Sequence, residues 1–272
     1  MTSRSICRAG FLLMMMSGGV RGGAPSAEPV RPEAVTRLFN GKDLSGLTTW
    51  LKDTKGGDPR RVFRVTADGL LHITGDGFGY VATEKAYHDY HLVVEYRWGK
   101  KTDGGEFVRN SGVLLHAAGQ EGAAGGTWMP SIECQLAQGC VGDLIVIRDK
   151  EADGATIPVR LTGNIVVGPD NRPRWKENGT ARVFTGGQLW WSRHDPDYKE
   201  LLDTRGKEDV ESPTGEWTRV ECICEGDRIT IRVNGTTVNA CHGVFPESGK
   251  ILLQSEGFEL FIRRFELHPL KK

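Results

Sequence analysis

The sequence predicts an all-β protein built as a two-sheet sandwich or barrel, and three observations carry that prediction. Alternation of apolar and polar residues with a period of two recurs along the chain, whereas helical periodicity is nearly absent. Glycine is abundant, with 36 of 272 residues, while proline, with 12, is ordinary. Many glycines in a well-patterned chain indicate tight turns between short strands, and a chain of this length can bury one substantial core.

The alternating runs define the expected strands. They cover residues 62–66, 70–74, 80–83, 90–98, 112–116, 131–137, 143–147, 217–225, 228–233, 237–241, 251–254 and 260–267. Val233-Asn234-Gly235-Thr236, which lies between two such runs, predicts a two-residue hairpin turn. Because no helical segments separate these strands, an antiparallel architecture is favoured over a parallel one.

One stretch, residues 150–215, breaks this rhythm. It contains five prolines and three tryptophans, and we expect a long loop insertion from one edge of the sandwich. Its tryptophans argue for order, because disordered segments are poor in aromatic residues. We therefore expect a single domain over residues 35–270 with this insertion inside it, preceded by a linker at 28–34.

The N-terminal residues 1–27 are typical of an export signal. They carry three arginines, no acidic residue, a short apolar run and then small residues, and the run is too short to span a bilayer. We expect an exported protein, periplasmic or extracellular, whose mature chain has no transmembrane segment. The whole chain has 35 basic and 35 acidic residues and no basic block, which argues against nucleic acid as a partner.

Five cysteines follow the export segment, so at least one thiol must be free within a single chain. Because buried free cysteine behaves as a small hydrophobic residue, we expect that role for most of them.

Alternation also sorts the side chains by face, and several polar ones lie opposite the apolar core positions. They are Glu95, Arg97, His116, Glu133, Gln135, Gln254 and Glu256. The simplest explanation is the solvated side of an antiparallel sheet, but such faces tend toward Lys, Thr and Ser. Glu133 is the strongest candidate for a catalytic acid or base, and the preceding Trp128-Met129-Pro130 segment could form the wall of a pocket.

Several segments resemble one enzyme family, the 3-keto-disaccharide hydrolases, also described as 3-keto-glucoside lyases and 3-keto-2-hydroxy-glucal hydratases. The matching stretches are LFNGKDLSG at 38–46, YHDYHL at 87–92, EYRW at 95–98, NSGV at 110–113, SIECQL at 131–136, WTRV at 217–220, VNG at 233–235, GKILLQ at 249–254 and IRRFEL at 262–267. The resemblance implies a concanavalin A-like jelly-roll sandwich, usually exported, that acts on an oligosaccharide or keto-sugar. Two positions depart from the family pattern: Arg264 replaces a common Asn, and Ser255-Glu256 lies near a frequent His.

A ketone at C3 of a sugar acidifies the hydrogen on C2, so a base can start an elimination that expels the C1 substituent. Water then adds back to give the free 3-keto sugar. We expect Glu133 or His116 to be the base and Arg97 with Gln135 to stabilise the developing oxyanion.

Five further residues are candidates for substrate binding: Glu95, Asn110, Trp128, Gln254 and Arg263. A divalent metal held by Glu133 and His116 is an alternative electrophile, although no spacing in the sequence establishes one.

Two other functions stay open on the sequence alone. A carbohydrate-binding module without catalysis would need aromatic platforms but no buried acid. A conventional glycoside hydrolase would need two carboxylates in one cleft, and Gln135 stands where the second one is expected on the strand of Glu133. Glu95 or Glu256 would then have to supply it.

Overall fold

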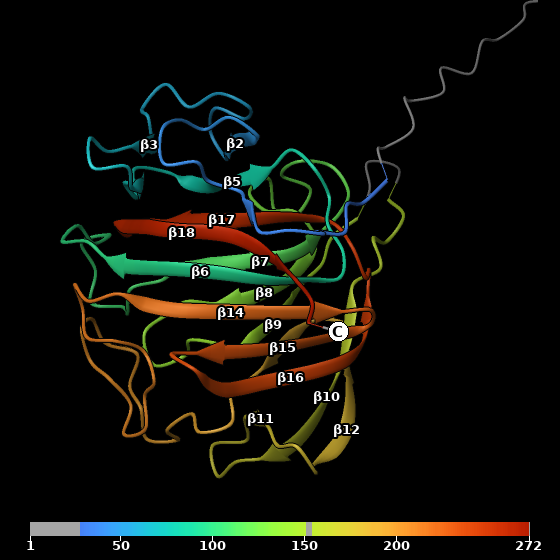
Figure 1. Ribbon diagram of the computed structural model, residues 1–272. Coiled ribbons are helices and arrows are strands. Elements are labelled where there is room, and N and C mark those ends of the chain that lie inside the picture. Colours follow the sequence, from blue (N-terminus) through green and yellow to red (C-terminus); the bar gives the residue numbers. More distant parts are fainter. Residues whose placement is uncertain (1–27, 151–153, 272) are drawn as a thin grey trace, which may run out of the picture.

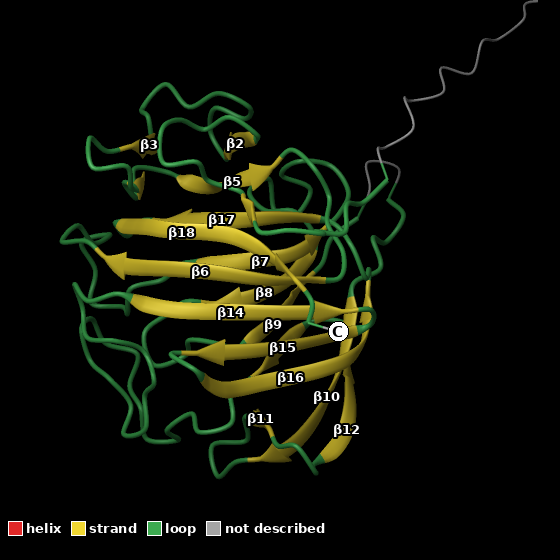
Figure 2. Ribbon diagram, viewed as in Figure 1, coloured by secondary structure: helices red, strands yellow, loops and turns green. Residues whose placement is uncertain are grey.

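The computed structural model describes residues 28–150 and 154–271, and these residues form two antiparallel β-sheets packed face to face (Figures 1 and 2). This confirms the predicted all-β jelly-roll sandwich. Within the described ranges there is no helix, and so no helical segment that could cross a lipid bilayer. The proposed export segment, residues 1–27, lies outside the described residues.

The larger sheet runs in the order β11-β10-β16-β15-β14-β6-β18-β4-β3, with β1 paired to β18 and β12 to β10. Its strands are β1 (Thr36–Arg37), β3 (Phe63–Val65), β4 (Leu71–Ile73), β6 (Tyr90–Trp98), β10 (Arg160–Val167), β11 (Pro173–Trp175), β12 (Thr180–Phe184), β14 (Thr218–Glu225), β15 (Arg228–Val233), β16 (Thr236–Phe245) and β18 (Leu260–Pro269).

The smaller sheet runs in the order β13-β9-β8-β7-β17-β5-β2 and lies behind the larger one in Figure 1. Its strands are β2 (Leu47–Leu51), β5 (Phe78–Thr83), β7 (Gly112–Ala117), β8 (Ser131–Gln135), β9 (Leu144–Ile147), β13 (Gly187–Leu189) and β17 (Lys250–Glu256).

The core between the sheets is built from the apolar half of each alternating strand. Leu92 and Val94 of β6 are fully buried there, as are Val113 and Leu115 of β7. Each such side chain contributes roughly 1.5–3 kcal/mol by leaving water. The opposite face of the smaller sheet is left without a covering sheet, and this face is called the free face below.

The hairpin predicted at Asn234-Gly235 joins β15 to β16. Both turn residues have positive φ angles, 47° and 81°, as this tight turn requires. The Asn234 side chain also serves the fold, because its Oδ1 accepts from the Arg219 backbone N–H (3.0 Å) and its Nδ2 donates to the Val210 carbonyl (2.9 Å).

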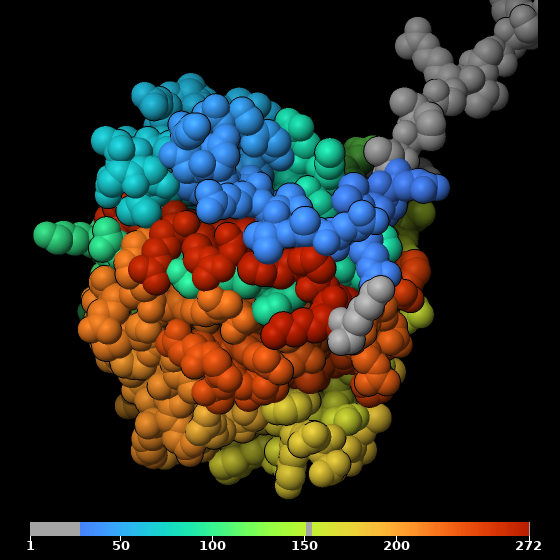
Figure 3. Space-filling view, in the orientation of Figure 1, coloured from blue at the N-terminus to red at the C-terminus, as the bar shows by residue number. Residues whose placement is uncertain are grey.

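Residues 28–34, expected as a linker, lie against the sandwich (Figure 3). The Val30 backbone N–H donates to the Ala86 carbonyl oxygen (2.8 Å), and the His88 N–H donates to that of Val30 (3.2 Å). Residues 28–34 are therefore hydrogen-bonded to the domain and form part of its edge.

The stretch at 150–215 is not the long loop that the sequence predicts, because it contains four strands. β10 pairs with β16 and so extends the larger sheet, whereas β13 pairs with β9 and extends the smaller one. Prolines and short strands obscure the alternation here; Pro173, for example, is itself the first residue of β11.

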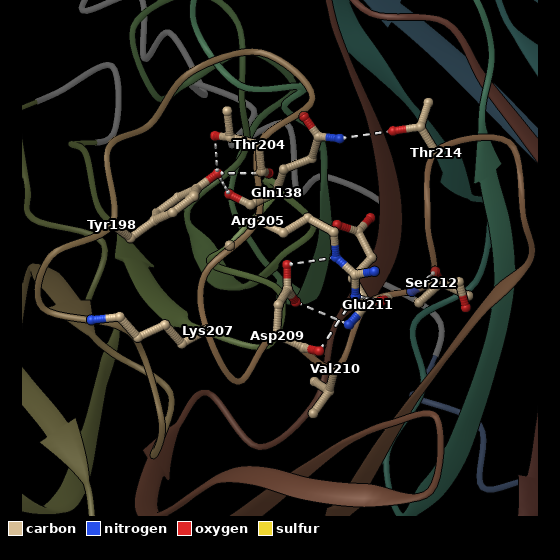
Figure 4. A network of polar contacts seen from close by, with 12 residues as sticks. Gln138, Tyr198, Thr204, Arg205, Lys207, Asp209, Val210, Glu211, Ser212 and Thr214 are labelled. Carbon is tan, nitrogen blue, oxygen red and sulfur yellow. Dashed lines mark hydrogen bonds and ion pairs between the residues drawn. The ribbon is translucent and has the colours of Figure 1, made fainter.

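The remainder of that stretch closes one end of the sandwich through a polar network (Figure 4). The Arg205 guanidinium contacts the Asp209 carboxylate (3.5 Å) and donates to the Glu211 carbonyl oxygen. The Glu211 carboxyl reaches into the core, where the Tyr96 hydroxyl and the Trp98 indole N–H both donate to it at 2.7 Å. Burial raises the pKa of Glu211 to about 8, so this carboxyl is largely protonated at neutral pH.

All five cysteines in the described residues are free and buried. They pack as small apolar groups, as expected.

Candidate functional site

The free face of the smaller sheet gathers several of the predicted polar side chains. The register places Glu133 of β8 opposite Leu114 of β7, and Leu114 opposite Leu252 of β17. One row further along, Gln135 lies opposite Gly112. Because residues two apart on a strand share a face, Glu133 and Gln135 project to the same side as Gln254 and Glu256 of β17.

Gly112 lets two of these side chains meet. A Cβ atom on Gly112 would stand 2.2 Å from Glu133 Oε1 and 2.4 Å from Gln254 Oε1, so both side chains lie directly over its backbone. Any larger residue on this central strand would hold them apart. The sheet thus positions Glu133 and Gln254 around a single glycine.

Glu133, which is buried, and Glu256, which is half-buried, form an interacting pair of carboxyl groups. Glu133 is 5% exposed, and burial raises its pKa well above the usual range; the charge of Glu256 raises this pKa further, while a hydrogen bond from Gln254 opposes the rise. Burial also raises the pKa of Glu256 to about 7. Two interacting acids of this kind titrate as a unit, so near neutral pH the pair holds a proton on one carboxyl while the other ionises.

Two buried acceptor oxygens at this place have no donor among the described residues. They are Gln254 Oε1 and Asn110 Oδ1. The segment of Asn110 lies against β17, because Ser111 Oγ donates to the Gln254 backbone carbonyl (3.1 Å). Buried acceptors are normally paired, and hydroxyl groups of a bound sugar would serve as donors.

The free face also carries an apolar floor beside the acids. Tyr80, Leu114, Met129 and Leu252 are buried there, and Trp128 packs against them. The Trp50 indole N–H donates to the Gly126 carbonyl oxygen (3.3 Å), which fastens the loop before Trp128 to the sheet.

His116 does not join this group, contrary to the sequence-based expectation. It sits at a bulge, where the register between β7 and β17 shifts, and its φ of 53° breaks the alternation. Its ring is fully buried, with Nδ1 donating to the Pro246 carbonyl oxygen (2.9 Å) and its edge against Tyr90. Burial lowers the pKa of His116 to about 4, so it is neutral at physiological pH. Glu133 is not among the groups that shift the pKa of His116.

The structure also separates Glu95, Arg97 and Arg263 from Glu133. They lie on β6 and β18 of the larger sheet and point to its outer side, so the core of the sandwich stands between them and the acids. Glu95 accepts from Arg263 Nε at 2.6 Å. Alternation identifies the outward face of each strand correctly, but it does not say to which sheet the strand belongs. Arg97 therefore cannot stabilise an oxyanion formed beside Glu133, as the sequence-based hypothesis required.

The metal site considered for Glu133 and His116 is not formed either, because the two side chains do not share a face. Among the described residues, no group of three or more His, Cys, Asp or Glu side chains is arranged to hold a metal ion.

Gly112 is the site residue that sequence reasoning missed, and Glu256 was considered only as a partner acid. The signal for Gly112 was a glycine at the start of a largely apolar strand, which often marks a close approach of another group. Gln135 stays on the face of Glu133, but its Oε1 accepts from the Leu136 backbone N–H (3.0 Å).

A jelly-roll sandwich with paired acids on its free face is an architecture that carbohydrate-active proteins use. The chain belongs to the family described as the 3-keto-alpha-glucoside-1,2-lyase-like domain, whose model matches residues 34–268. A search of curated protein sequences found no match.

Solved structures with similar folds include two candidate glycosyl hydrolases from Parabacteroides distasonis. The first is 20% identical, with 88% of this chain and 95% of that chain covered and a TM-score of 0.50. The second is 17% identical, with 87% and 99% covered and a TM-score of 0.48. The carbohydrate-binding module CBM66 from Bacillus subtilis is 12% identical, with 82% and 95% covered and a TM-score of 0.44. At 20% identity, the likeness to the first structure shows the fold alone.

Proposed function

We propose that the protein cleaves 3-keto-glycosides by elimination followed by hydration. The base removes the hydrogen from C2, a C1–C2 double bond forms, and the C1–O bond breaks as the leaving oxygen takes a proton. Water then adds its hydroxyl to C1 and a proton to C2. This sequence needs one acid and one base at the same pH, together with groups that hold the sugar hydroxyls.

The single observation that supports this proposal is the pair of interacting carboxyl groups, Glu133 and Glu256, on the free face of the smaller sheet. Glu133, the more deeply buried of the two, holds the proton of the pair and donates it to the leaving oxygen. Glu256, with a pKa raised to about 7, supplies the base. This reverses the role that the sequence suggested for Glu133. Gln254 and Asn110 accept hydrogen bonds from substrate hydroxyls.

The burial of Glu133 favours this proposal over a binding module, because a module gains nothing from an acid with a perturbed pKa. A conventional glycoside hydrolase is the second candidate. Glu256 supplies the second carboxyl that Gln135 could not, and two cleft carboxyls are the minimum requirement for that chemistry.

One experiment separates the two reactions. The protein is incubated in D₂O with a 3-keto disaccharide and, in parallel, with the unoxidised parent disaccharide. Elimination and hydration predict cleavage of the keto form only, with deuterium at C2 of the product beyond that of an enzyme-free control. Cleavage of the parent sugar, or a product without added deuterium at C2, would favour direct hydrolysis.

We also propose that residues 1–27 direct export. A chain that stays in the cytoplasm when expressed with these residues intact would contradict this.

A further inference from the structure

A cavity lies on the outer side of the larger sheet, across the sandwich from Glu133. Its volume is about 470 Å³, and its lining residues come from the end of β6, the start of β18 and the segment before β14. The residues around it are Arg97, Trp98, Gly99, Lys100, Thr214, Gly215, Glu259 and Phe261. A volume of several hundred Å³ is typical of small-molecule sites.

Arg97 lines this cavity, and its guanidinium group stacks on aromatic rings. Its guanidinium carbon lies 4.9 Å from the centre of the Trp217 ring and 5.4 Å from that of Phe261. Within the part of the chain that the structure describes, its side chain has no hydrogen bond and no ion pair. Stacking on two rings fixes the plane of the guanidinium but leaves its N–H donors unused.

The neighbouring arginines of the same sheet face show how unusual this is. Arg263, Arg264 and Arg219 all pair with the Glu95 carboxylate, at 2.6, 3.2 and 3.3 Å. An acidic partner is therefore available on this face, yet Arg97 is directed into the cavity instead. The N–H donors of Arg97 are therefore not free because acidic residues are missing from this sheet face. They are free because the side chain is held in the cavity.

The other charges around the cavity leave it positive. Lys100 makes no side-chain ion pair with any described residue. Glu259 is the one acid present, and both of its oxygens are engaged elsewhere: Oε1 with His72 Nε2 (2.8 Å), and Oε2 with the backbone N–H groups of Lys100 and Lys101 (2.8 and 3.3 Å).

We propose that this cavity is a second carbohydrate site, which binds the carboxylate of an acidic sugar. Arg97 would grip the two carboxylate oxygens through parallel N–H donors, the geometry that a fixed guanidinium matches best. Lys100 adds a second positive charge, and Phe261 with Trp98 provides an apolar wall for the sugar ring. The proposal does not depend on the reaction assigned to Glu133 and Glu256.

The test measures the binding of methyl glucuronide and of methyl glucoside to the whole protein. Calorimetry gives the affinities, and shifts of the tryptophan indole N–H signals in NMR report binding at the cavity. We expect methyl glucuronide to bind at least tenfold more tightly than the neutral glucoside. Arg97→Gln should weaken glucuronide binding at least tenfold. Arg228→Gln, at an exposed arginine of the same sheet without an ion pair among the described residues, should not change it.

Two further measurements distinguish a loss of sugar binding from a loss of folding. Arg97→Lys keeps the charge but loses the planar fork, so it should bind the glucuronide with intermediate affinity even if Arg97→Gln proves unstable. Turnover of a 3-keto disaccharide should be the same in Arg97→Lys as in the natural protein. Equal binding of the two sugars, or unchanged glucuronide binding in both Arg97 variants, would overturn the proposal whatever the protein catalyses.

Discussion

Replacing Gly112 by alanine should disable the site while leaving the fold intact. The new Cβ would stand 2.2 Å from Glu133 Oε1 and 2.4 Å from Gln254 Oε1, whereas carbon makes comfortable contacts at about 3.5 Å. Each side-chain end must therefore retreat by about 1 Å. Both are tips of flexible side chains, and Gly112 does not have a left-handed φ, so the backbone accepts alanine.

A displacement of about 1 Å of a catalytic group typically costs roughly 100-fold in turnover. Stability should change by less than about 1 kcal/mol, because alanine is also the better residue inside a strand. The assay is kcat on a 3-keto disaccharide together with the unfolding midpoint.

Gly56→Ala is the matched control, since a Cβ there meets nothing within 4 Å and the φ is ordinary. Natural turnover in a folded Gly112→Ala protein would refute the placement of the site.

Three other predictions follow. Glu133→Gln and Glu256→Gln should each lower kcat by roughly 10²–10⁴-fold without unfolding the protein, as measured by single-turnover kinetics and circular dichroism, because each removes one of the two proton-transfer groups; an active Glu133→Gln enzyme would exclude its role as the acid. Glu211→Gln should make the free energy of unfolding depend less on pH. Because the pKa of Glu211 is raised to about 8 in the folded protein, its full contribution to that free energy is present below about pH 4.5. This contribution is lost at up to about 1.4 kcal/mol per pH unit as the pH rises toward 8. Denaturant unfolding of both proteins at pH 5 and pH 8 tests this, and parallel pH slopes would contradict it. Phe265→Ala, which empties a fully buried core position, should cost about 3–5 kcal/mol in the same unfolding assay, and a loss under 1 kcal/mol would show that Phe265 is not in the core.

The sequence predicted most strands because burial on one face imposes a strict period of two. β6 was expected at its observed bounds, and the Asn234-Gly235 turn was expected because few residues accept two successive positive φ angles. β11, β12 and β13 were missed because they have only three to five residues, and β10, which has eight, was missed because Gly163-Asn164 in its middle is typical of a turn.

The site was harder to predict, because alternation tells which face a residue occupies but not which sheet. Glu133 and Gln254 were grouped correctly on one face, whereas Glu95 and Arg97 lie on the outer side of the other sheet. The error at His116 has a different cause, since a one-residue bulge reverses the face of the side chain and leaves no mark in the apolar pattern.

The shared proton of Glu133 and Glu256 is the central claim, and a carboxyl ¹³C NMR titration of the protein tests it most directly. We predict that Glu256 titrates at about pH 7 and that the pKa of Glu133 lies well above its usual range, and falls in Glu256→Gln because a repelling charge is gone. Two glutamates that titrate independently near pH 4.5 would contradict the account.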